Sequence, residues 1–291
     1  MPIDARTRLY AFFAHPCGHS ISPAMHNAAF QALGMNCVYL AFDVDEAGLG
    51  DAMAAMRTLP IRGANLSMPN KVAVIPLLDE LGPEAELMGA VNTIVNDNGR
   101  LIGRNTDGAG WFRGIRELGV DLRGKKLTLV GAGGAAKAIL VQSALEGADE
   151  IALFNRRSRR WEEAKALSER ITAATGCRVT LHELNNQDPF CRSDLRRSID
   201  ESVLLSNATN VGMGALEGQT WLPGEACLRS DLAVTDVIYA PAETELLRLA
   251  RLAGCKTQNG GPMVLYQGAA AFSYWTGQEM PVEAVRPLLG L

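Results

Sequence analysis

The segment from Leu127 to Ala136 constrains the fold of this chain more than any other. It reads Leu-Thr-Leu-Val-Gly-Ala-Gly-Gly-Ala-Ala, so an apolar run ends at glycines and small residues follow. This pattern predicts a strand, a tight turn and a helix, which together begin a dinucleotide-binding βαβ unit. Gly131 permits the turn, and Gly133 lets the backbone approach a pyrophosphate beside the N–H groups of the helix. The alternative is a tight turn that binds nothing.

The next expected strand, 150–154, ends in a basic run rather than an acidic residue. Asn155 is followed by Arg-Arg-Ser-Arg-Arg. An acid about 20 residues beyond the first glycine would bind a ribose 2′-hydroxyl, whereas arginine there accommodates a 2′-phosphate through its planar fork. The run therefore favours NADP over NAD. The alternative is a solvated basic start of a helix.

Composition limits the class of protein and its partners. The chain has 291 residues, which favours two domains, and its net charge of −4 argues against a nucleic-acid partner. Its six cysteines form no C-x-x-C pair, which is typical of a reduced, cytoplasmic protein. The apolar run 9–14 is too short for a signal peptide or a membrane span. Pro and Gly separate His15, His19 and His26, so we expect no metal site.

Strands and helices alternate along the chain, which predicts an α/β fold. The expected strands of the first half are 8–14, 37–44, 61–67 and 91–95, with helices over 23–33, 46–58 and 70–81. A second alternation starts at 126, with further strands near 150–154, 177–183, 203–206 and 233–238. We therefore expect two α/β domains, the second a Rossmann-like doubly wound parallel sheet. The expected division is 1–107 with 260–291 for the substrate and 108–259 for the dinucleotide, with the active site in the cleft between them.

Several polar residues of the first half follow expected strands. Ser20 and Ser22 precede a helix and suit a carboxylate, although Ser22 alone would also serve as an N-cap before Pro23. Lys71 falls in a first helical turn, where the helix dipole disfavours a cation, so the position slightly favours a function over a solvated surface lysine.

Taken together, these motifs resemble the shikimate/quinate dehydrogenase family over nearly the whole chain. The segments that carry the resemblance are His19–Pro23, Gly63–Lys71, Gly89–Thr93, Asn105–Gly108, Gly131–Ala136, Asn155–Arg156, Asp236–Pro241 and Gly260–Gln267. The sequences of these segments are most similar to those of the branch that accepts quinate as well as shikimate.

The resemblance implies roles for individual residues. Lys71 and Asp107 would be the catalytic pair that exchanges the hydroxyl proton while hydride moves to or from the nicotinamide. The substrate would be bound by Ser20, Ser22, Ser67, Asn92, Tyr239 and Gln267. The cofactor would be bound by Gly131, Ala132, Gly133, Gly134, Ala135, Asn155, Arg156, Arg157, Ser158, Arg160, Thr209, Val237, Gly260 and Met263.

The implied activity is reversible, NADP-preferring reduction of 3-dehydroshikimate to shikimate, with quinate oxidation to 3-dehydroquinate as a second activity. The alternatives are a dehydrogenase of an amino-substituted quinate or shikimate analogue, and a non-catalytic NADP-sensing module. The expected partner is a small molecule, and the expected assembly is a monomer or homodimer. Two positions depart from the family pattern. Pro262 replaces a usual glycine, and Ser158 stands where an acid often helps to bind NAD.

Overall fold

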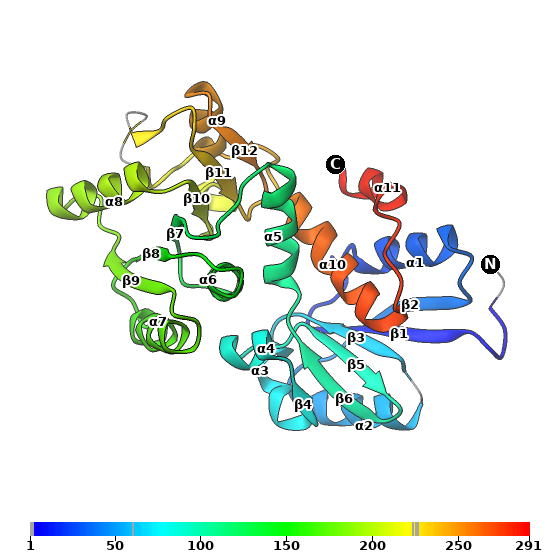
Figure 1. The fold of residues 1–291 in the computed structure, drawn as a ribbon. Helices are drawn as coiled ribbons and strands as arrows, with labels where there is room; N and C mark the ends of the chain where they lie inside the picture. The colour runs from blue at the N-terminus through cyan, green and yellow to red at the C-terminus, as the bar shows by residue number, and fades with distance from the viewer. Residues whose placement is uncertain (1–2, 60, 223, 225–226) are drawn as a thin grey trace. The chain divides into compact units, whose positions relative to one another are not determined.

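The computed structural model describes residues 3–59, 61–222, 224 and 227–291, and the chain divides into two compact units (Figure 1). The first comprises Met1–Gly110 and Leu265–Leu291, and the second comprises Trp111–Val264. These boundaries lie a few residues beyond those expected from the sequence. Both fall inside helices, namely α5 (Asp107–Glu117) and α10 (Gly261–Thr276). Pro262 lies in the first turn of α10, where its missing N–H costs no helical hydrogen bond.

The first unit contains a mixed six-stranded sheet in the order β2-β1-β3-β5-β6-β4. Its strands are β1 (Arg8–Ala14), β2 (Cys37–Asp43), β3 (Gly63–Leu66), β4 (Glu80–Leu81), β5 (Thr93–Asp97) and β6 (Arg100–Arg104). β1 is parallel to β2 and β3, whereas β5 is antiparallel to both β3 and β6. The sheet is therefore parallel on one side and carries an antiparallel hairpin on the other.

Alternating side chains of β1 divide the core of this unit between the two faces of the sheet. Tyr10 and Phe12 pack with α1 (Ser22–Ala32), α10 and α11 (Val282–Val285). Ala11 and Phe13 pack with α2 (Leu49–Thr58) and α4 (Pro83–Met88) on the other face. Helices thus cover both faces, as the alternation of the sequence predicts.

The region after β3 differs from the sequence expectation. The predicted helix over 70–81 is wrong, because α3 (Asn70–Ala73) is followed by a 3₁₀ helix (Ile75–Leu77) and by β4. Pro76 lies in this 3₁₀ helix, and its missing N–H prevents one α-helix from continuing through 81. The strand expected over 91–95 is shifted to Thr93–Asp97, and β6 was not predicted. The hairpin turn consists of Asn98 and Gly99, whose positive φ angles of 53° and 95° are typical of a two-residue Asn-Gly turn.

His26 of α1 is completely buried, with its ring stacked on that of Tyr39 at a centroid distance of 4.5 Å. Burial lowers the pKa of His26 from 6.5 to about 3, so the imidazole is neutral in the folded protein. Between these two values the unfolded chain binds one more proton than the folded chain at this residue. The free energy of unfolding should therefore fall as the pH falls.

We expect His26→Phe to make the acid side of the stability curve shallower. The imidazole contributes a slope of up to about 1.4 kcal/mol per pH unit below its unfolded pKa, and this contribution disappears with the ring. Denaturant unfolding at a series of pH values measures the slope. His19→Phe is the matched control, because His19 is exposed. Equal slopes in the wild type and His26→Phe would contradict the prediction.

The second unit has six parallel strands in the order β12-β11-β10-β7-β8-β9, which confirms the predicted Rossmann-like sheet. The strands are β7 (Lys126–Val130), β8 (Glu150–Asn155), β9 (Arg178–Glu183), β10 (Leu204–Asn207), β11 (Ala233–Asp236) and β12 (Lys256–Gln258). The strand order reverses direction at β7. β12 was not predicted.

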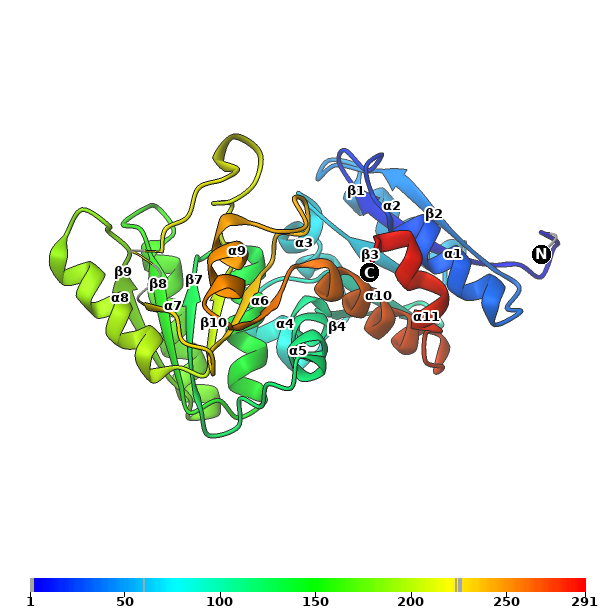
Figure 2. The same cartoon turned by 90° about the horizontal axis from the view of Figure 1, so that it is seen from above.

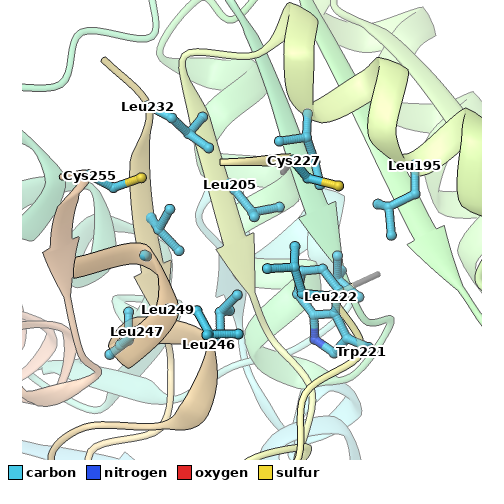
Figure 3. Close-up of a cluster of buried hydrophobic side chains, with 14 of the residues drawn as sticks. Leu195, Leu205, Trp221, Leu222, Cys227, Leu232, Leu246, Leu247, Leu249 and Cys255 are labelled. Carbon is cyan, nitrogen blue, oxygen red and sulfur yellow. The ribbon is translucent and has the colours of Figure 1, made fainter. Parts of the chain in front are cut away.

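Helices cover both faces of this second sheet (Figure 2). α6 (Gly134–Leu145) and α7 (Trp161–Thr175) contribute Leu140 and Leu167 beside Leu153 of β8. α8 (Pro189–Glu201) and α9 (Glu245–Leu252) cover the other face, where Leu195 and Leu246 join a buried cluster with Trp221 (Figure 3). Within the described residues, no helix is both long enough and apolar enough to cross a bilayer.

Candidate active site and dinucleotide pocket

The ends of three neighbouring strands bring Lys71, Asn92 and Asp107 together in the first unit. Lys71 lies in α3 just after β3, Asn92 directly precedes β5, and Asp107 begins α5 just after β6. Because β5 runs antiparallel to its two neighbours, its start lies at the same edge as the ends of β3 and β6. This placement follows from the register, which pairs Asn65 with Thr93 and Thr93 with Arg104.

At this edge a lysine and an aspartate form a half-buried ion pair. Lys71 Nζ lies 2.6 Å from Asp107 Oδ2, and the two side chains are 25% and 18% exposed. Asn92 Nδ2 donates to the other carboxylate oxygen, Oδ1, over 2.8 Å. Each oxygen of Asp107 therefore has its own partner, and the carboxylate cannot rotate without losing one. The structure brings these three predicted residues into direct contact.

Behind the ion pair, a buried hydrogen-bond network fixes the Asn92 amide. Asn92 Oδ1 accepts from Thr106 N at 2.8 Å and from Thr93 Oγ1 at 2.9 Å, so its nitrogen faces Asp107. The Thr93 hydroxyl also accepts from Asn65 Nδ2 at 3.0 Å. Asn65 Oδ1 in turn accepts from the Tyr39 hydroxyl at 2.9 Å.

Tyr39 is the member of this network that the sequence analysis missed. A tyrosine inside an apolar strand reads as a core residue, and its hydrogen bond depends on contacts that the strand pattern does not show. Burial raises the pKa of the Tyr39 hydroxyl well above its usual range, so it stays protonated and acts as a donor.

The two serines after β1 lie at the start of α1. The structure places Ile21 at the N-cap and shows no side-chain cap there, so the capping role considered for Ser22 is wrong. Instead, Ser20 Oγ accepts from Ser22 N at 3.2 Å. Both serines are half-exposed, which leaves their hydroxyls accessible.

The other predicted substrate residues lie in both units. Ser67 directly follows β3, and Gln267 lies on α10 in the part of that helix that belongs to the first unit. Tyr239 follows β11 in the second unit and is 60% exposed.

The second unit contains a cavity of about 650 Å³ at the carboxyl ends of its central strands, which we call the β7–β10 pocket. Apart from Trp221, which comes from a later segment, it is lined by residues that follow or end β7, β8, β9 and β10: Gly131, Ala132, Gly133, Asn155, Arg156, Arg160, Leu184, Asn185, Asn186, Gln187, Ala208, Thr209, Asn210 and Val211. β7 is where the strand order reverses, which is the usual ligand position in open α/β sheets. Arg156 and Arg160 are its two cations, and none of its described lining residues is acidic.

Half of the predicted cofactor residues line this pocket. They are Gly131, Ala132, Gly133, Asn155, Arg156, Arg160 and Thr209. Gly134, Ala135, Arg157, Ser158, Val237, Gly260 and Met263 are not among its lining residues. The lining residues that were not predicted are 184–187, Ala208, Asn210, Val211 and Trp221. The first of these segments follows β9, and its place at a strand end was the available signal.

Arg157 turns to other partners. Its Nε lies 3.2 Å from Glu183 Oε2, and its guanidinium carbon lies 4.0 Å from the centroid of the Trp161 ring. Ser158 uses its hydroxyl to accept from Arg160 N at 3.3 Å. The pocket lining thus includes Arg156 and Arg160 but not Arg157.

The pocket is shaped for close approach of a polar ligand to the backbone. Gly131 has a φ of 115°, and a Cβ there would lie 2.5 Å from the carbonyl oxygen of Ala208. At Gly133 a Cβ would meet no atom closer than Arg160, at 3.9 Å, so this backbone faces open space. Asn155 Nδ2 is buried without a hydrogen-bond partner among the described residues. These features suit a dinucleotide phosphate on Gly133 and a polar ligand group on Asn155. Over the described part of the chain, no three His, Cys, Asp or Glu side chains gather as metal ligands.

The sequence and the structure both match known proteins. Residues 12–94 match the family model "Shikimate dehydrogenase substrate binding domain", and residues 262–289 match "Shikimate 5'-dehydrogenase C-terminal domain". A shikimate dehydrogenase (NADP(+)) of Listeria monocytogenes is 47% identical over 287 residues, which cover 99% of this chain and 97% of that protein.

Two solved structures extend this similarity. Shikimate 5-dehydrogenase from Listeria monocytogenes, in complex with shikimate and NAD, has a TM-score of 0.95 at 47% identity and covers 99% of this chain and 98% of its own. Quinate dehydrogenase from Corynebacterium glutamicum, in complex with NAD, has a TM-score of 0.85 at 33% identity, with 98% of this chain and 99% of its own covered. The chain therefore belongs to the shikimate dehydrogenase family.

Proposed function

We propose that this chain catalyses the reversible, NADP-preferring reduction of 3-dehydroshikimate to shikimate. Membership of the family makes it an oxidoreductase that acts on a CH–OH group with NAD(P). The observation that carries the proposal is the ion pair of Lys71 and Asp107, with Asn92 holding the second carboxylate oxygen. A sensing module without catalysis would have no use for this arrangement.

In the proposed reaction, Lys71 exchanges a proton with the reacting hydroxyl. Oxidation of a secondary alcohol releases a proton from oxygen and a hydride from carbon, and the bound nicotinamide accepts that hydride. The amine of Lys71 takes the proton in this direction, and its ammonium returns the proton to the carbonyl oxygen in ketone reduction. Asp107 orients the Lys71 amine across 2.6 Å and can accept a hydrogen bond from a ring hydroxyl.

The β7–β10 pocket is the proposed site for NADP. Gly131, Ala132 and Gly133 would contact the pyrophosphate, and Asn155 would offer its buried Nδ2 to the ribose or its phosphate. Arg156 and Arg160 would pair with the 2′-phosphate. Thr209 would line the dinucleotide further along, and Val237, Gly260 and Met263 are proposed for its nicotinamide end.

The remaining substrate contacts are assigned to polar residues that the family resemblance indicates. Ser20 and Ser22 would bind the carboxylate of shikimate, and Ser67, Tyr239 and Gln267 would contact its hydroxyls or complete the pocket. We propose quinate as a second substrate, which the similarity to the Corynebacterium glutamicum quinate dehydrogenase supports. A monomer or homodimer in the cytoplasm is the proposed state, and the six free cysteines fit a reducing compartment.

Steady-state rates with shikimate and quinate, each with NADP⁺ and NAD⁺, test the proposal directly. We expect shikimate with NADP⁺ to give the highest kcat/KM of the four combinations. An aminated analogue in the same panel tests the alternative of an amino-substituted substrate. Binding of NADP⁺ without turnover of any of these compounds would instead support a sensing module.

The carboxylate contact gives a prediction of its own. Ser20→Ala and Ser22→Ala should each raise KM for shikimate by about tenfold or more, because a hydrogen bond to a charged group contributes roughly 1.5–3 kcal/mol. The Kd for NADP⁺ should not change. The melting temperature is the control, because Ser20→Ala also removes the bond to Ser22 N. A lower melting temperature with an unchanged KM would make the serines purely structural.

A further inference from the structure

Two buried polar residues lie next to each other just behind the β7–β10 pocket. Asn207 ends β10 and Asp236 ends β11, and the strand register pairs the two positions. Asn207 is 0% exposed and Asp236 is 2% exposed. Asn207 Nδ2 donates to Asp236 Oδ1 over 3.0 Å. Neither residue is among those that line the pocket.

Asn207 holds three residues that do line the pocket. Its Oδ1 accepts from the Thr209 N–H at 3.1 Å and from the Thr209 hydroxyl at 2.8 Å. The same oxygen accepts from Trp221 Nε1 at 2.9 Å, and Nδ2 also donates to the Val211 carbonyl at 3.3 Å. One side chain therefore ties the loop after β10 to Trp221, which comes from a separate segment (Figure 3).

This arrangement works only with one orientation of the Asn207 amide. The Thr209 N–H and Trp221 Nε1 can only donate, so they require the amide oxygen. A carboxylate can only accept, so Asp236 requires the amide nitrogen and excludes the flipped orientation.

Asp236 also accepts hydrogen bonds from residues that follow β11. Its Oδ1 accepts from Ile238 N at 3.0 Å, and its Oδ2 accepts from the Thr244 hydroxyl at 2.8 Å. Ile238 O accepts from Gly260 N at 2.9 Å, and a Cβ on Gly260 would lie 2.0 Å from Val237 O. The donors to Asp236 are all neutral, and burial raises the pKa of its carboxyl. The carboxyl thus joins the loops that follow β10 and β11.

We propose that Asp236 and Asn207 act as a positioning pair for the dinucleotide. Asp236 accepts from the Asn207 amide nitrogen and anchors that side chain, and the amide holds the pocket wall formed by Thr209, Val211 and Trp221. This inference rests on the proposed binding of NADP in the β7–β10 pocket, and it adds a role for two residues that do not contact the ligand.

Removal and conservative replacement of the two side chains provide the test. Asp236→Ala removes the acceptor of Asn207 Nδ2, Ile238 N and the Thr244 hydroxyl, whereas Asp236→Asn can keep an oxygen toward Asn207 Nδ2 and Ile238 N. Asn207→Asp places two carboxylates against each other. Asp236→Ala and Asn207→Asp should each raise the Kd for NADP⁺ about tenfold or more, with kcat at saturating NADP⁺ and shikimate near the wild-type value. Asp236→Asn should bind NADP⁺ with an affinity close to that of the wild type.

Thr128→Val is the matched control, because the Thr128 hydroxyl is buried in β7 and bonds to Ser198 and Ser202 at 2.8 and 2.9 Å, away from the pocket lining. It should lower the melting temperature and leave the Kd for NADP⁺ unchanged. If Asp236→Ala and Asn207→Asp behave like Thr128→Val, or if Asp236→Asn binds NADP⁺ no better than Asp236→Ala, the positioning role is refuted. A wild-type protein that bound no NADP⁺ would refute the proposed function together with this inference.

Discussion

Lys71→Ala should lower kcat for shikimate oxidation by about 10²–10⁴-fold while KM for shikimate stays close to the wild-type value. The variant removes the group proposed to take the hydroxyl proton, whereas Asp107 keeps its hydrogen bond from Asn92. Steady-state kinetics at saturating NADP⁺ measures both constants. A tenfold rise in KM with kcat intact would show that Lys71 only binds the substrate.

Lys71→Arg separates proton transfer from charge. Arginine retains the positive charge beside Asp107 but does not release its proton in proteins, so kcat should still collapse. Lys126→Ala is the matched control, because Lys126 is also half-buried and paired, with Glu150 at 2.9 Å and Glu201 at 2.5 Å. It lies at the start of β7, at the end of the strand opposite the pocket, and should leave kcat unchanged. Full activity of Lys71→Arg would assign the lysine an electrostatic role alone.

The cluster around Lys71 contains residues that could be predicted from the sequence and residues that could not. The family resemblance indicated Lys71, Asn92 and Asp107, and position alone favoured a function only for Lys71, in the first turn of an expected helix. Asn92 lies at the same edge of the sheet as the ends of β3 and β6 because it precedes β5, which is antiparallel to them. The signal for this hairpin, Asn98-Gly99, was present in the sequence and was not used. Tyr39 could not be assigned to the network, because its bond to Asn65 spans three strands of the sheet.

The second unit was predicted more completely because the sequence motifs that indicate its fold and its pocket are local. The glycine turn and the basic run after β8 each lie within a few residues of a strand end, where propensity and spacing are informative. What the sequence could not decide was which arginines face the pocket. Arg157 does not line the pocket and instead contacts Trp161 and Glu183, which lies 26 residues away in the sequence. A tertiary contact of this kind cannot be predicted from the spacing of residues within one segment.

Arg156→Ala and Arg160→Ala should each weaken NADP⁺ binding far more than NAD⁺ binding. A charge-assisted hydrogen bond to the 2′-phosphate contributes roughly 1.5–3 kcal/mol, so each loss corresponds to a factor of about 10–150 in affinity. NAD⁺ lacks this phosphate and should bind nearly as it does to the wild type. Kd values for both cofactors at two salt concentrations measure the effect, and added salt should reduce the wild-type preference for NADP⁺.

Arg157→Ala is the matched control for this pair, since it removes an adjacent guanidinium that is already paired with Glu183 and stacked on Trp161. Its ratio of NADP⁺ to NAD⁺ affinity should stay near that of the wild type. A loss as large as that of Arg156→Ala would mean that Arg157 leaves Glu183 when the cofactor binds. Equal kcat/KM values for the two cofactors in the wild type would contradict the preference itself, because the phosphate would then gain nothing from the two arginines that line the pocket.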